Sequence, residues 1–340
     1  MFIPAPFEIT PEILNLIAAI DEFKGAWKAS KPLPTPRLAA LKHTSTIAGY
    51  AASARIEGRP LSDREVEAWL AKPAKASATP DHLDAAAYAG LLDRIFNAGG
   101  DIALTTHQIR RLHRELMHYP AKDPRSGYKT RPNDLPRFDE TGHPLAAFAT
   151  ASPADTPRRM RDLVAWTDAE LARRALHPLL VIAIFIAAFL EIRPFEEGTG
   201  RLSRLLTTLL MLQSGYTYVP YSSLEARIDD NKDDYYAAFS EIQGDPPTWL
   251  PWLSVFLGTL RQQTEVLATE MAAGHAMTAD MPDLSVQIMT QVSRHRRVTL
   301  ADMVALTGAS RNTLKYHLIQ LVEKRHLTLH GKGRGAWYGC

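Results

Sequence analysis

The longest apolar run in the chain, from Leu179 to Leu190, covers twelve residues and directly follows Pro178. Proline suits the first turn of a helix, because its missing N–H would have no partner there. Twelve residues are too few to cross the apolar interior of a bilayer, which needs about 20. We therefore expect a central apolar helix in a soluble protein, with no membrane partner.

Helical periodicity dominates the rest of the chain, and strand patterns are scarce until its end. The fold class is therefore expected to be mainly α. Besides the central helix at Pro178–Leu190, the expected helices are Pro11–Trp27, Leu38–Ala54, Asp63–Ala71, His82–Asn97, Thr106–Met117, Pro157–Ala175, Arg201–Leu212, Ser223–Gln243 and Thr248–Glu270. A stretch rich in proline, glycine and aspartate, from Pro120 to Pro144, is long enough to be a functional loop.

The composition limits the classes of protein that fit. Of 340 residues, 46% are hydrophobic and 22% are charged, which is ordinary for a globular chain with two or three domains. The single cysteine, Cys340, excludes an internal disulfide and a cysteine-rich zinc site. The first twenty residues lack a basic segment followed by an apolar one, so no secretory signal is visible and we expect a cytoplasmic location.

Charge is distributed unevenly along the chain. Residues 283–340 contain nine Lys or Arg and three Asp or Glu, a net charge of +6. The other 282 residues carry 30 basic and 34 acidic side chains, a net charge of −4. A basic C-terminal module on a mildly acidic body suggests that only this module meets a polyanion. Residues 271–282 are predicted to be the linker that precedes it.

The helices expected in the C-terminal module are mostly shorter than those in the rest of the chain. Three are expected, at Leu284–Ser293, at Leu300–Leu306 with Thr299 as its cap, and at Ala309–Glu323. Two strands, Leu327–Leu329 and Ala336–Tyr338, should form a β-hairpin around a glycine-rich tip. This order resembles a winged helix-turn-helix.

The third helix of this module and the hairpin tip would carry contacts to DNA. The outward donors on the helix are Ser310, Arg311, Asn312, Lys315 and Tyr316, and those at the tip are Lys332 and Arg334. These side chains suit phosphates and base edges, so we expect DNA as a partner. The alternative is a module for dimerisation or protein docking, in which the basic residues form a solvated face.

The most informative segment, Ile192–Arg204, follows the central helix and reads IRPFEEGTGRLSR. Its Gly-x-Gly turn opens a helix and directs unpaired backbone N–H groups at one point, which attracts an anion. Arg201 and Arg204 lie three residues apart on that helix and can converge on phosphate oxygens, and Glu197 could hold Mg²⁺ against those phosphates. The spacing indicates a nucleotide phosphate site. A glycine turn with solvated arginines is the alternative.

The segment resembles the signature of Fic (Fido-fold) proteins, His-Pro-Phe-x-Asp/Glu-Gly-Asn-Gly-Arg-x-x-Arg. The resemblance implies a helical nucleotidyltransferase with a short β-hairpin flap, which usually moves AMP from ATP onto a Ser, Thr or Tyr hydroxyl of a target protein. Other segments share the resemblance: His177-Pro178 before the apolar helix, Gly127–Thr130 at the flap, Tyr221–Ser223 and Asn231–Tyr236 in later helices, and Ser53–Gly58 at the inhibitory motif Ser/Thr-x-x-x-Glu-Gly/Asn.

Most of the chain fits Fic proteins that have an N-terminal inhibitory helix and a C-terminal winged helix. Residues 1–95 would then be the N-terminal helical region with that helix, and residues 96–270 the nucleotide-binding core. The linker at 271–282 and the winged helix-turn-helix at 283–340 would follow. Fold analogy alone suggests a homodimer.

The resemblance also assigns roles by position. ATP and Mg²⁺ would bind at Glu197–Arg204. Arg201 and Arg204 would bind the β- and γ-phosphates, Gly198 and Gly200 would form the anion hole, and Glu197 would bind Mg²⁺. Thr199 would stand in the place of the asparagine, and Tyr235 and Tyr236 would lie near the adenine. Tyr128, Lys129 and Thr130 would dock the target protein at the flap. Ser53 and Glu57 would obstruct the site, because Glu57 would pair with Arg204 and remove the clamp on the γ-phosphate. Without the resemblance to this family, Glu57 would be interpreted as one partner of a weak surface salt bridge.

Two signature residues differ in this chain. Arg193 stands where the family has its histidine, the general base, and arginine stays protonated up to about pH 12. Thr199 replaces the asparagine and loses the longer reach of its amide. Among the histidines, His143 follows the flap in a loop, whereas His107, His113 and His177 are expected to pack, face solvent or start a helix. We therefore expect little or no AMP transfer, and a phosphate site to which Arg193 adds a third cation.

The sequence leaves three functions open. The first is a degenerate Fic protein that binds ATP and acts as a nucleotide-responsive, DNA-binding regulator. The second is an active protein adenylyltransferase, autoinhibited by Glu57, with an unusual base or donor. The third is a plain DNA-binding repressor that uses the Fic part as a dimer scaffold. It requires no nucleotide affinity, and the retained arginines, glycines and Glu197 argue against it.

Overall fold

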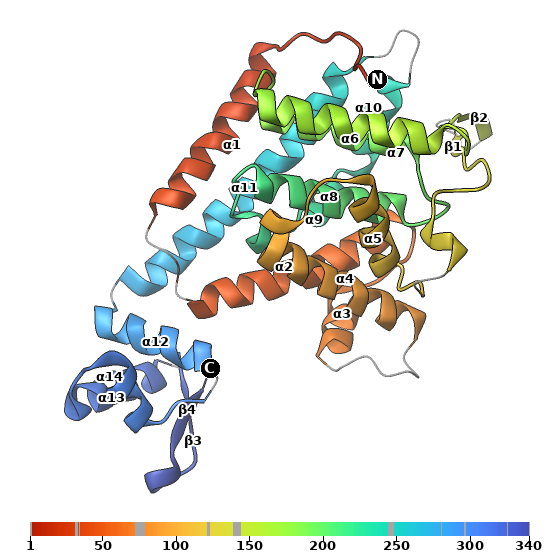
Figure 1. Ribbon diagram of the computed structural model, residues 1–340. Coiled ribbons are helices and arrows are strands. Elements are labelled where there is room, and N and C mark those ends of the chain that lie inside the picture. The colour runs from red at the N-terminus through yellow and green to blue at the C-terminus, as the bar shows by residue number, and fades with distance from the viewer. Residues whose placement is uncertain are drawn as a thin grey trace. The chain divides into compact units, whose positions relative to one another are not determined.

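The computed structural model describes residues 2–30, 33, 35–71, 79–120, 123–138, 144–243, 248–279, 281–295, 297–324 and 326–339. Within these ranges helices form most of the structure, and two pairs of short strands accompany them (Figure 1). The mainly α fold expected from the sequence is confirmed. None of the helices in these ranges is long and apolar enough to cross a membrane.

The chain forms two compact units. Unit 1 contains Met1–Trp27 and Ser45–Thr264, and unit 2 contains Lys28–Thr44 and Glu265–Cys340. The N-terminal region and the core, expected as separate parts at 1–95 and 96–270, therefore belong largely to one unit.

Unit 1 is built mainly from helices. Their bounds are α1 (Pro11–Ala29), α2 (Thr35–Ile56), α3 (Asp63–Leu70), α4 (Pro80–Ala98), α5 (Thr106–Leu116), α6 (Thr156–Arg173), α7 (Pro178–Ile192), α8 (Thr199–Gln213), α9 (Leu224–Asp230), α10 (Lys232–Ile242) and α11 (Leu250–Ala279). Of these, α1, α2 and α11 contribute residues to both units.

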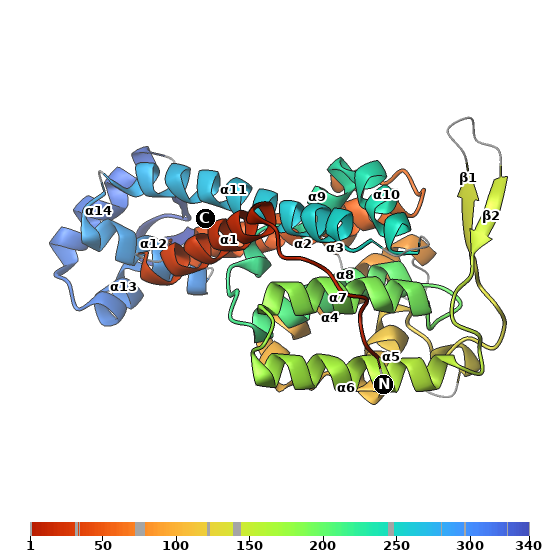
Figure 2. The same cartoon turned by 90° about the horizontal axis from the view of Figure 1, so that it is seen from above.

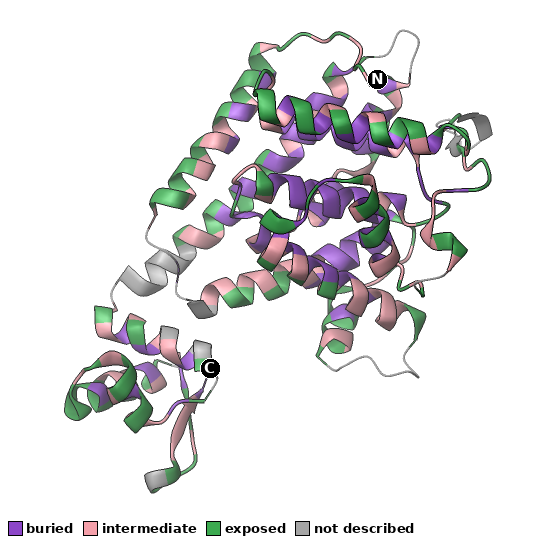
Figure 3. Cartoon of the chain, in the orientation of Figure 1, coloured by how far each residue is buried: buried purple, intermediate pink, exposed green. Residues whose placement is uncertain are grey.

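The central helix of unit 1 is α7. All of its residues from Leu179 to Phe189 are buried, as is Ile192, because a helix that is apolar on every side has no polar face for solvent. Helices α6 and α8 pack on α7, and Figure 2 shows the three side by side. Nε1 of the fully buried Trp252, on α11, donates to the carbonyl oxygen of Ala183 at 2.9 Å. Buried residues concentrate on α7 and α8 (Figure 3), so both helices that flank the motif loop are firmly packed.

Two helix boundaries differ from the expectation for physical reasons. The helix expected at Ser223–Gln243 is divided at Asn231, whose φ of −127° is not helical and whose side-chain amide donates to the carbonyl oxygen of Arg227. Asparagine interrupts helices readily, because its amide competes for backbone partners. The segment expected as a linker at 271–282 is helical as far as Ala279, since its alanines and methionines favour helix and no proline occurs before Pro282.

The β-hairpin of unit 1 lies later in the chain than expected. Residues 127–130 form no strand, whereas β1 (Leu135–Phe138) and β2 (Pro144–Phe148) pair antiparallel, with Leu135 opposite Phe148. Proline cannot donate to a strand ladder and normally argues against a strand. Pro136 and Pro144 therefore concealed these strands from the sequence pattern.

The C-terminal part of unit 2 contains three helices and then a hairpin. Their bounds are α12 (Asp283–His295), α13 (Leu300–Thr307), α14 (Arg311–Glu323), β3 (Thr328–His330) and β4 (Trp337–Gly339). Thr299 caps α13 in a capping box with Asp302, and Gly308 ends the helix with a φ of 69°. The core of this part consists of Ile288, Val292, Val298, Met303, Leu314, Leu318, Leu321 and Leu327. The order of elements and the cap at Thr299 agree with the expectation from the sequence.

Candidate functional site

The motif lies in the loop between α7 and α8. Pro194 cannot continue a helix, and Arg193 before it adopts a left-handed conformation with φ 45° and ψ 65°. Gly198, with a φ of 75°, leads into α8. The first turn of α8 leaves backbone N–H groups without partners inside the helix. The loop therefore ends in N–H donors that the helix itself does not use, beside the arginines of the motif.

Helix α5 packs directly against this loop. A Cβ atom added at Gly198 would lie 2.6 Å from Sδ of Met117, so glycine is needed for space as well as for its positive φ. The ring of His113 stacks on Phe195 with a centroid distance of 3.7 Å, and its Nε2 lies 3.0 Å from the carbonyl oxygen of Glu197. Burial lowers the pKa of His113 to about 4, so the neutral ring donates from Nε2 to that oxygen. His113 thus supports the loop from behind.

Arg201 and Arg204 follow the turn on α8, and both are buried, at 6% and 4% exposed. Nη2 of Arg204 donates to Oγ of Ser53 at 2.5 Å and lies 3.4 Å from Oε1 of Glu57. Nε of Arg201 lies 3.1 Å from Oε2 of Glu57. One carboxylate at the end of α2 therefore pairs with both guanidinium groups, whereas the sequence led us to expect Arg204 alone.

The end of α2 holds these two residues in place. Ser53 is fully buried, and Gly58 follows Glu57 with a φ of 81°. The N–H of Gly58 donates to the carbonyl oxygen of Arg55, and the N–H of Arg59 donates to that of Ala54, each at 2.9 Å. This left-handed glycine turn satisfies the last carbonyl groups of the helix and fixes Glu57 at its end.

A second carboxylate, Asp84 on α4, was not found from the sequence. Its Oδ2 lies 3.3 Å from Nη1 of Arg201 and 3.3 Å from Nη1 of Arg59, and its Oδ1 lies 2.7 Å from Nε2 of His118. No motif marks this residue, because only the packing of α4 on α8 brings it to the arginine. Arg201 is therefore engaged by two carboxylates of the protein itself.

Glu197 is exposed on the motif loop, and its carboxylate accepts a hydrogen bond from the hydroxyl of Tyr119. Among the described residues, no group of three or more His, Cys, Asp or Glu side chains could hold a metal ion. Magnesium is commonly bound by one or two carboxylates while phosphates and water complete its shell. Glu197 thus fits Mg²⁺ as a ligand that acts together with a nucleotide.

The two departures from the signature lie in different surroundings. Thr199 is buried, and its hydroxyl donates to the carbonyl oxygen of Phe195 at 3.3 Å, so it is used within the loop. Arg193 is half-buried, and burial lowers the pKa of its guanidinium, which the charges of Tyr236 and Glu57 oppose. Its Nε has no hydrogen-bond partner in the part of the chain that the structure describes.

The two tyrosines of α10 differ in exposure. Tyr235 is buried, with its ring edge-on to Trp252 at 4.9 Å, and burial raises the pKa of its hydroxyl. Tyr236 is 40% exposed. Of the two tyrosines expected near an adenine, Tyr236 alone presents its ring to solvent.

Lys129, expected to dock a target, is only 3% exposed. Its Nζ donates to Oδ1 of Asn133 at 2.7 Å, to Oγ1 of Thr150 at 2.8 Å and to the carbonyl oxygen of Ile192 at 3.1 Å. Burial, together with the charge of Arg193, lowers its pKa to about 8. This side chain is therefore committed to the end of α7 and to the residues that flank the hairpin.

The neighbours of Lys129 are engaged with the same loop. The ring of Tyr128 lies 5.8 Å from that of Phe195, and the exposed Thr130 donates its hydroxyl to Oε1 of Glu196 at 2.9 Å. Thr130 is thus the one member of this group, Tyr128 to Thr130, that remains open to a partner.

Three further histidines were singled out from the sequence, His107, His143 and His177. His177 caps α7, as expected, and its Nε2 lies 3.1 Å from Oδ2 of Asp21. His107 is exposed on α5. His143 lies outside the described residues.

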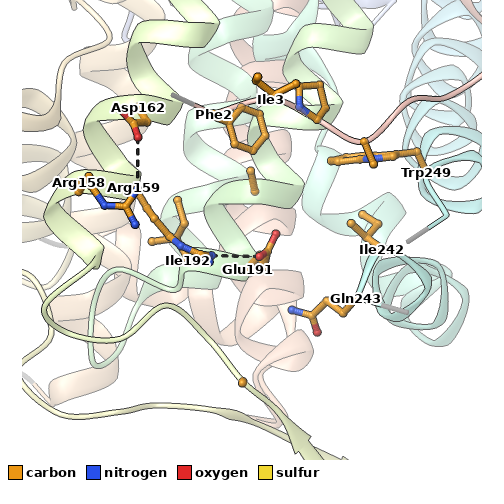
Figure 4. A pocket seen from close by; sticks show the side chains of 14 residues that line it. Phe2, Ile3, Arg158, Arg159, Asp162, Glu191, Ile192, Ile242, Gln243 and Trp249 are labelled. Carbon is orange, nitrogen blue, oxygen red and sulfur yellow. Dashed lines mark hydrogen bonds and ion pairs between the residues drawn. The ribbon is translucent and has the colours of Figure 1, made fainter. Parts of the chain in front are cut away.

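A cavity of about 640 Å³ lies beside the last turn of α7, lined also by α6, α10 and the N-terminal segment (Figure 4). Its charged side chains are paired: Arg159 lies 3.2 Å from Glu191, and Arg158 lies 3.6 Å from Asp162. Neither arginine of the motif lines it. A phosphate would find no uncompensated cation among the described lining residues, so the motif is the candidate site.

The residues expected to contact DNA lie on α14 and at the turn between β3 and β4. Exposed among them are Ser310, Arg311, Asn312, Lys315, Tyr316 and Lys332. Ser310 also caps α14, since its side chain accepts from the N–H of Thr313. The side chain of Arg334 lies outside the described part of the structure.

Residues 103–211 match the family model described as Fic/DOC family. They extend from the segment before α5 into α8 and include the complete motif loop. The chain contains a Fic-family domain.

Relatives with established names are similar to part of the chain. The protein adenylyltransferase Fic of Drosophila erecta is 30% identical over 115 residues, which are 34% of this chain and 21% of that protein. The protein of the same name from Drosophila sechellia is 29% identical over 115 residues, which are again 34% of this chain and 21% of that protein. The alignment thus spans about a fifth of the length of these relatives and supports a Fic-type AMP-transferase lineage.

Solved structures share the fold over more of the chain. A Fic family protein from Desulfovibrio desulfuricans is 20% identical, with a TM-score of 0.66 over 99% of this chain and 98% of the other. A Fic domain containing signaling protein from Bacteroides thetaiotaomicron is 22% identical, with a TM-score of 0.60 over 77% of this chain and 97% of the other. Identities this low show the Fic fold and nothing further.

The burial of His113 makes the stability of the Fic domain depend on pH. The pKa of this histidine is about 4 when folded, against an ordinary value of 6.5. Between these values the unfolded chain binds a proton that the folded chain excludes. The free energy of unfolding should therefore fall as pH falls from 6.5 to 4, by up to about 3 kcal/mol.

Urea unfolding at pH 7 and at pH 4.5 measures this loss. The variant His113→Gln should lose less stability between the two pH values than the wild type. His107→Gln, at an exposed histidine on the same helix, should behave as the wild type does. Equal losses in the wild type and His113→Gln would contradict the lowered pKa.

Proposed function

We propose that this protein binds ATP with Mg²⁺ at Glu197–Arg204, in a site that α2 obstructs. We further propose that it acts as a nucleotide-responsive, DNA-binding regulator whose AMP transfer is weak or lost. The observation that carries the proposal is the pairing of Glu57 with both Arg201 and Arg204. Two buried guanidinium groups beside the start of a helix suit phosphate oxygens, which accept charge-assisted hydrogen bonds from such donors.

The nucleotide phosphates would take the place of the carboxylate. The free N–H groups and the positive dipole of α8 would hold one phosphate, and Arg201 and Arg204 would hold its neighbours. Gly200 adjoins this clamp, since a Cβ atom there would lie 3.4 Å from Nη1 of Arg204. Mg²⁺, when bound with ATP, would neutralise phosphate charge, and Glu197 would hold it after releasing the hydroxyl of Tyr119.

Obstruction by α2 acts through charge. Glu57 and a phosphate are both anions that require the same donors, so they compete for Arg201 and Arg204. ATP that binds without displacing Glu57 would lack the clamp on its γ-phosphate. Its α-phosphorus would then be turned away from in-line attack.

Transfer of AMP requires that the oxygen of a target hydroxyl attack the α-phosphorus. The bond to the β-phosphate oxygen then breaks, pyrophosphate leaves, and the hydroxyl proton must pass to a base. Arg193 occupies the position of that base and stays protonated, so it cannot accept the proton. A positioned base contributes about 10²–10⁴-fold, and transfer should be slower by that factor.

Removal of the obstructing carboxylate should strengthen nucleotide binding. Glu57→Gly should bind ATP with Mg²⁺ about tenfold more tightly than the wild type, a difference of about 1.4 kcal/mol. In this variant the carboxylate of Glu57 no longer competes with the phosphates for the two arginines. Titration calorimetry with a non-hydrolysable ATP analogue measures the Kd. Glu67→Gly, at an exposed glutamate of α3, should leave the Kd unchanged.

The arginine variants provide the opposite test of the same site. Arg201→Ala and Arg204→Ala, each made in the Glu57→Gly background, should lose most of the affinity. Undiminished binding in both would show that ATP binds elsewhere on the chain.

Transfer itself can be separated from binding. Incubated with α-labelled ATP and Mg²⁺, Glu57→Gly should label neither itself nor the proteins of a cell lysate, because the base is missing. Glu57→Gly/Arg193→His should produce a labelled band, measured on the same gel. A band from Glu57→Gly alone would establish the alternative, an active adenylyltransferase that Glu57 inhibits.

The C-terminal residues support DNA as the second partner. Residues 283–340 carry a net charge of +6, and Arg311, Asn312 and Lys315 are exposed on one helix. The order of three helices and a hairpin resembles a winged helix-turn-helix, in which such a helix enters the major groove. Exposed basic side chains bind phosphates and release counterions, which makes binding depend on salt.

Arg311→Ala and Lys315→Ala should each weaken binding to a mixed-sequence 30-base-pair duplex and lower its salt dependence by about one released counterion. Fluorescence anisotropy at several salt concentrations measures both quantities. Arg64→Ala, at an exposed arginine of α3, should change neither. A wild-type protein that fails to bind the duplex at 50 mM salt would favour the docking alternative.

A further inference from the structure

Gly49 and Ser53 on α2, and Glu57 directly after its last residue, follow one another at intervals of four residues. Residues four apart lie nearly above one another on a helix, so these three share one face. Ser53 and Glu57 contact Arg204 from this face. Gly49, one turn before Ser53, is buried as well. Glycine weakens a helix relative to alanine, so a buried glycine on this face calls for a reason in the packing.

The space beside Gly49 is filled by a fixed polar cluster. A Cβ atom added at Gly49 would lie 2.9 Å from the hydroxyl of Tyr88, 3.3 Å from Oε2 of Glu225 and 3.4 Å from Oγ of Ser223. The first distance is shorter than real Cβ contacts, and the other two are tight. The cluster therefore leaves no room for any side chain at this position.

None of the three neighbours can turn aside at low cost. Tyr88 is fully buried, and its hydroxyl donates to Oε1 of Glu225 at 2.7 Å. Glu225 is 4% exposed, and Oγ of Ser223 donates to its Oε2 at 3.2 Å. A carboxylate this deeply buried needs its hydrogen bonds, so a shift that breaks them is expensive. With the cluster fixed, an added side chain would displace α2 instead.

We propose that Gly49 is the positioning residue of the obstructing contact: its missing side chain lets α2 approach closely enough for Ser53 and Glu57 to engage the motif arginines. This inference rests on the proposed function, in which that contact competes with ATP. The contact tolerates little displacement, because the Arg204–Glu57 distance is already 3.4 Å. Hydrogen bonds weaken steeply beyond such lengths. A small outward shift of α2 therefore weakens the pairing of Glu57 with Arg204 while every charged residue of the site is retained.

The decisive variant is Gly49→Ala in the full chain, with the Kd of a non-hydrolysable ATP analogue and Mg²⁺ as the readout. It should bind the analogue several-fold more tightly than the wild type, in the direction of Glu57→Gly. In the Gly49→Ala background, Glu57→Gly should tighten binding less than it does in the wild type, because the contact is already weakened. Gly90→Ala, at an exposed helical glycine with nothing within 4 Å of its added Cβ, controls for helix propensity and should leave the Kd unchanged.

A second substitution that makes room for the added Cβ atom tests whether Gly49→Ala acts by displacing α2 or by a general loss of packing. Tyr88→Phe removes the atom nearest to the added Cβ, so Gly49→Ala/Tyr88→Phe should bind less tightly than Gly49→Ala. It should still bind more tightly than Tyr88→Phe alone, since Glu225 and Ser223 remain close. This last comparison decides the question even where Gly49→Ala by itself does not fold.

The outcomes distinguish the two proposals. If Glu57→Gly binds no more tightly than the wild type, the obstruction by α2 is wrong, and the role of Gly49 is wrong with it. If Glu57→Gly binds more tightly while Gly49→Ala matches the wild type and the double variant matches Tyr88→Phe, the role of Gly49 alone is overturned.

Discussion

Two buried positive charges on α8 determine how the surrounding helices of unit 1 are arranged. A guanidinium group removed from water costs several kcal/mol unless it is paired, and Arg201 and Arg204 are both more than nine-tenths buried. The protein supplies the partners from two other helices, with Ser53 and Glu57 on α2 and Asp84 on α4. In the proposed function, nucleotide binding is therefore an exchange of partners. Its free energy is the difference between phosphate and carboxylate at the same donors, so a well-formed phosphate site can have a modest apparent affinity.

The motif loop needs a second kind of support, because its carbonyl oxygens require donors. The backbone N–H of Lys129 donates to the carbonyl oxygen of Pro194 at 2.8 Å, and the amide of Asn133 donates to that of Phe195 at 2.7 Å. Nζ of Lys129 reaches the carbonyl oxygen of Ile192 at the end of α7, and Nε2 of His113 reaches that of Glu197 in the loop. With its acceptors satisfied by these residues, the loop is held in one conformation, and the donors at the start of α8 remain for an anion.

The sequence predicted those features that depend on short spacings along the chain. The apolar run gave α7, the glycine turn and the two arginines predicted a phosphate site, and the resemblance of Ser53–Gly58 to the inhibitory motif predicted the contact of Glu57 with Arg204. Asp84 and Lys129 could not be found in this way, because only the packing of α4 on α8 and of the pre-hairpin loop on the motif brings them there. The place of the hairpin was missed because its prolines contradict the usual strand pattern. Residues whose role depends on a distant partner carry no local signal.

Arg193 changes what the site is able to stabilise. Its guanidinium is half-buried, its Nε lacks a hydrogen-bond partner among the described residues, and burial lowers its pKa, so its charge is poorly compensated in the present arrangement. An anion bound at the motif would compensate three cations where the family has two and a histidine. If the resemblance assigns this position correctly, the arginine that replaces the base thus also increases the demand for an anion. A transferase consumes its nucleotide, whereas a regulator needs an occupancy that reverses as the nucleotide concentration changes. The loss of chemistry and the gain of binding that we propose at this position favour the same function.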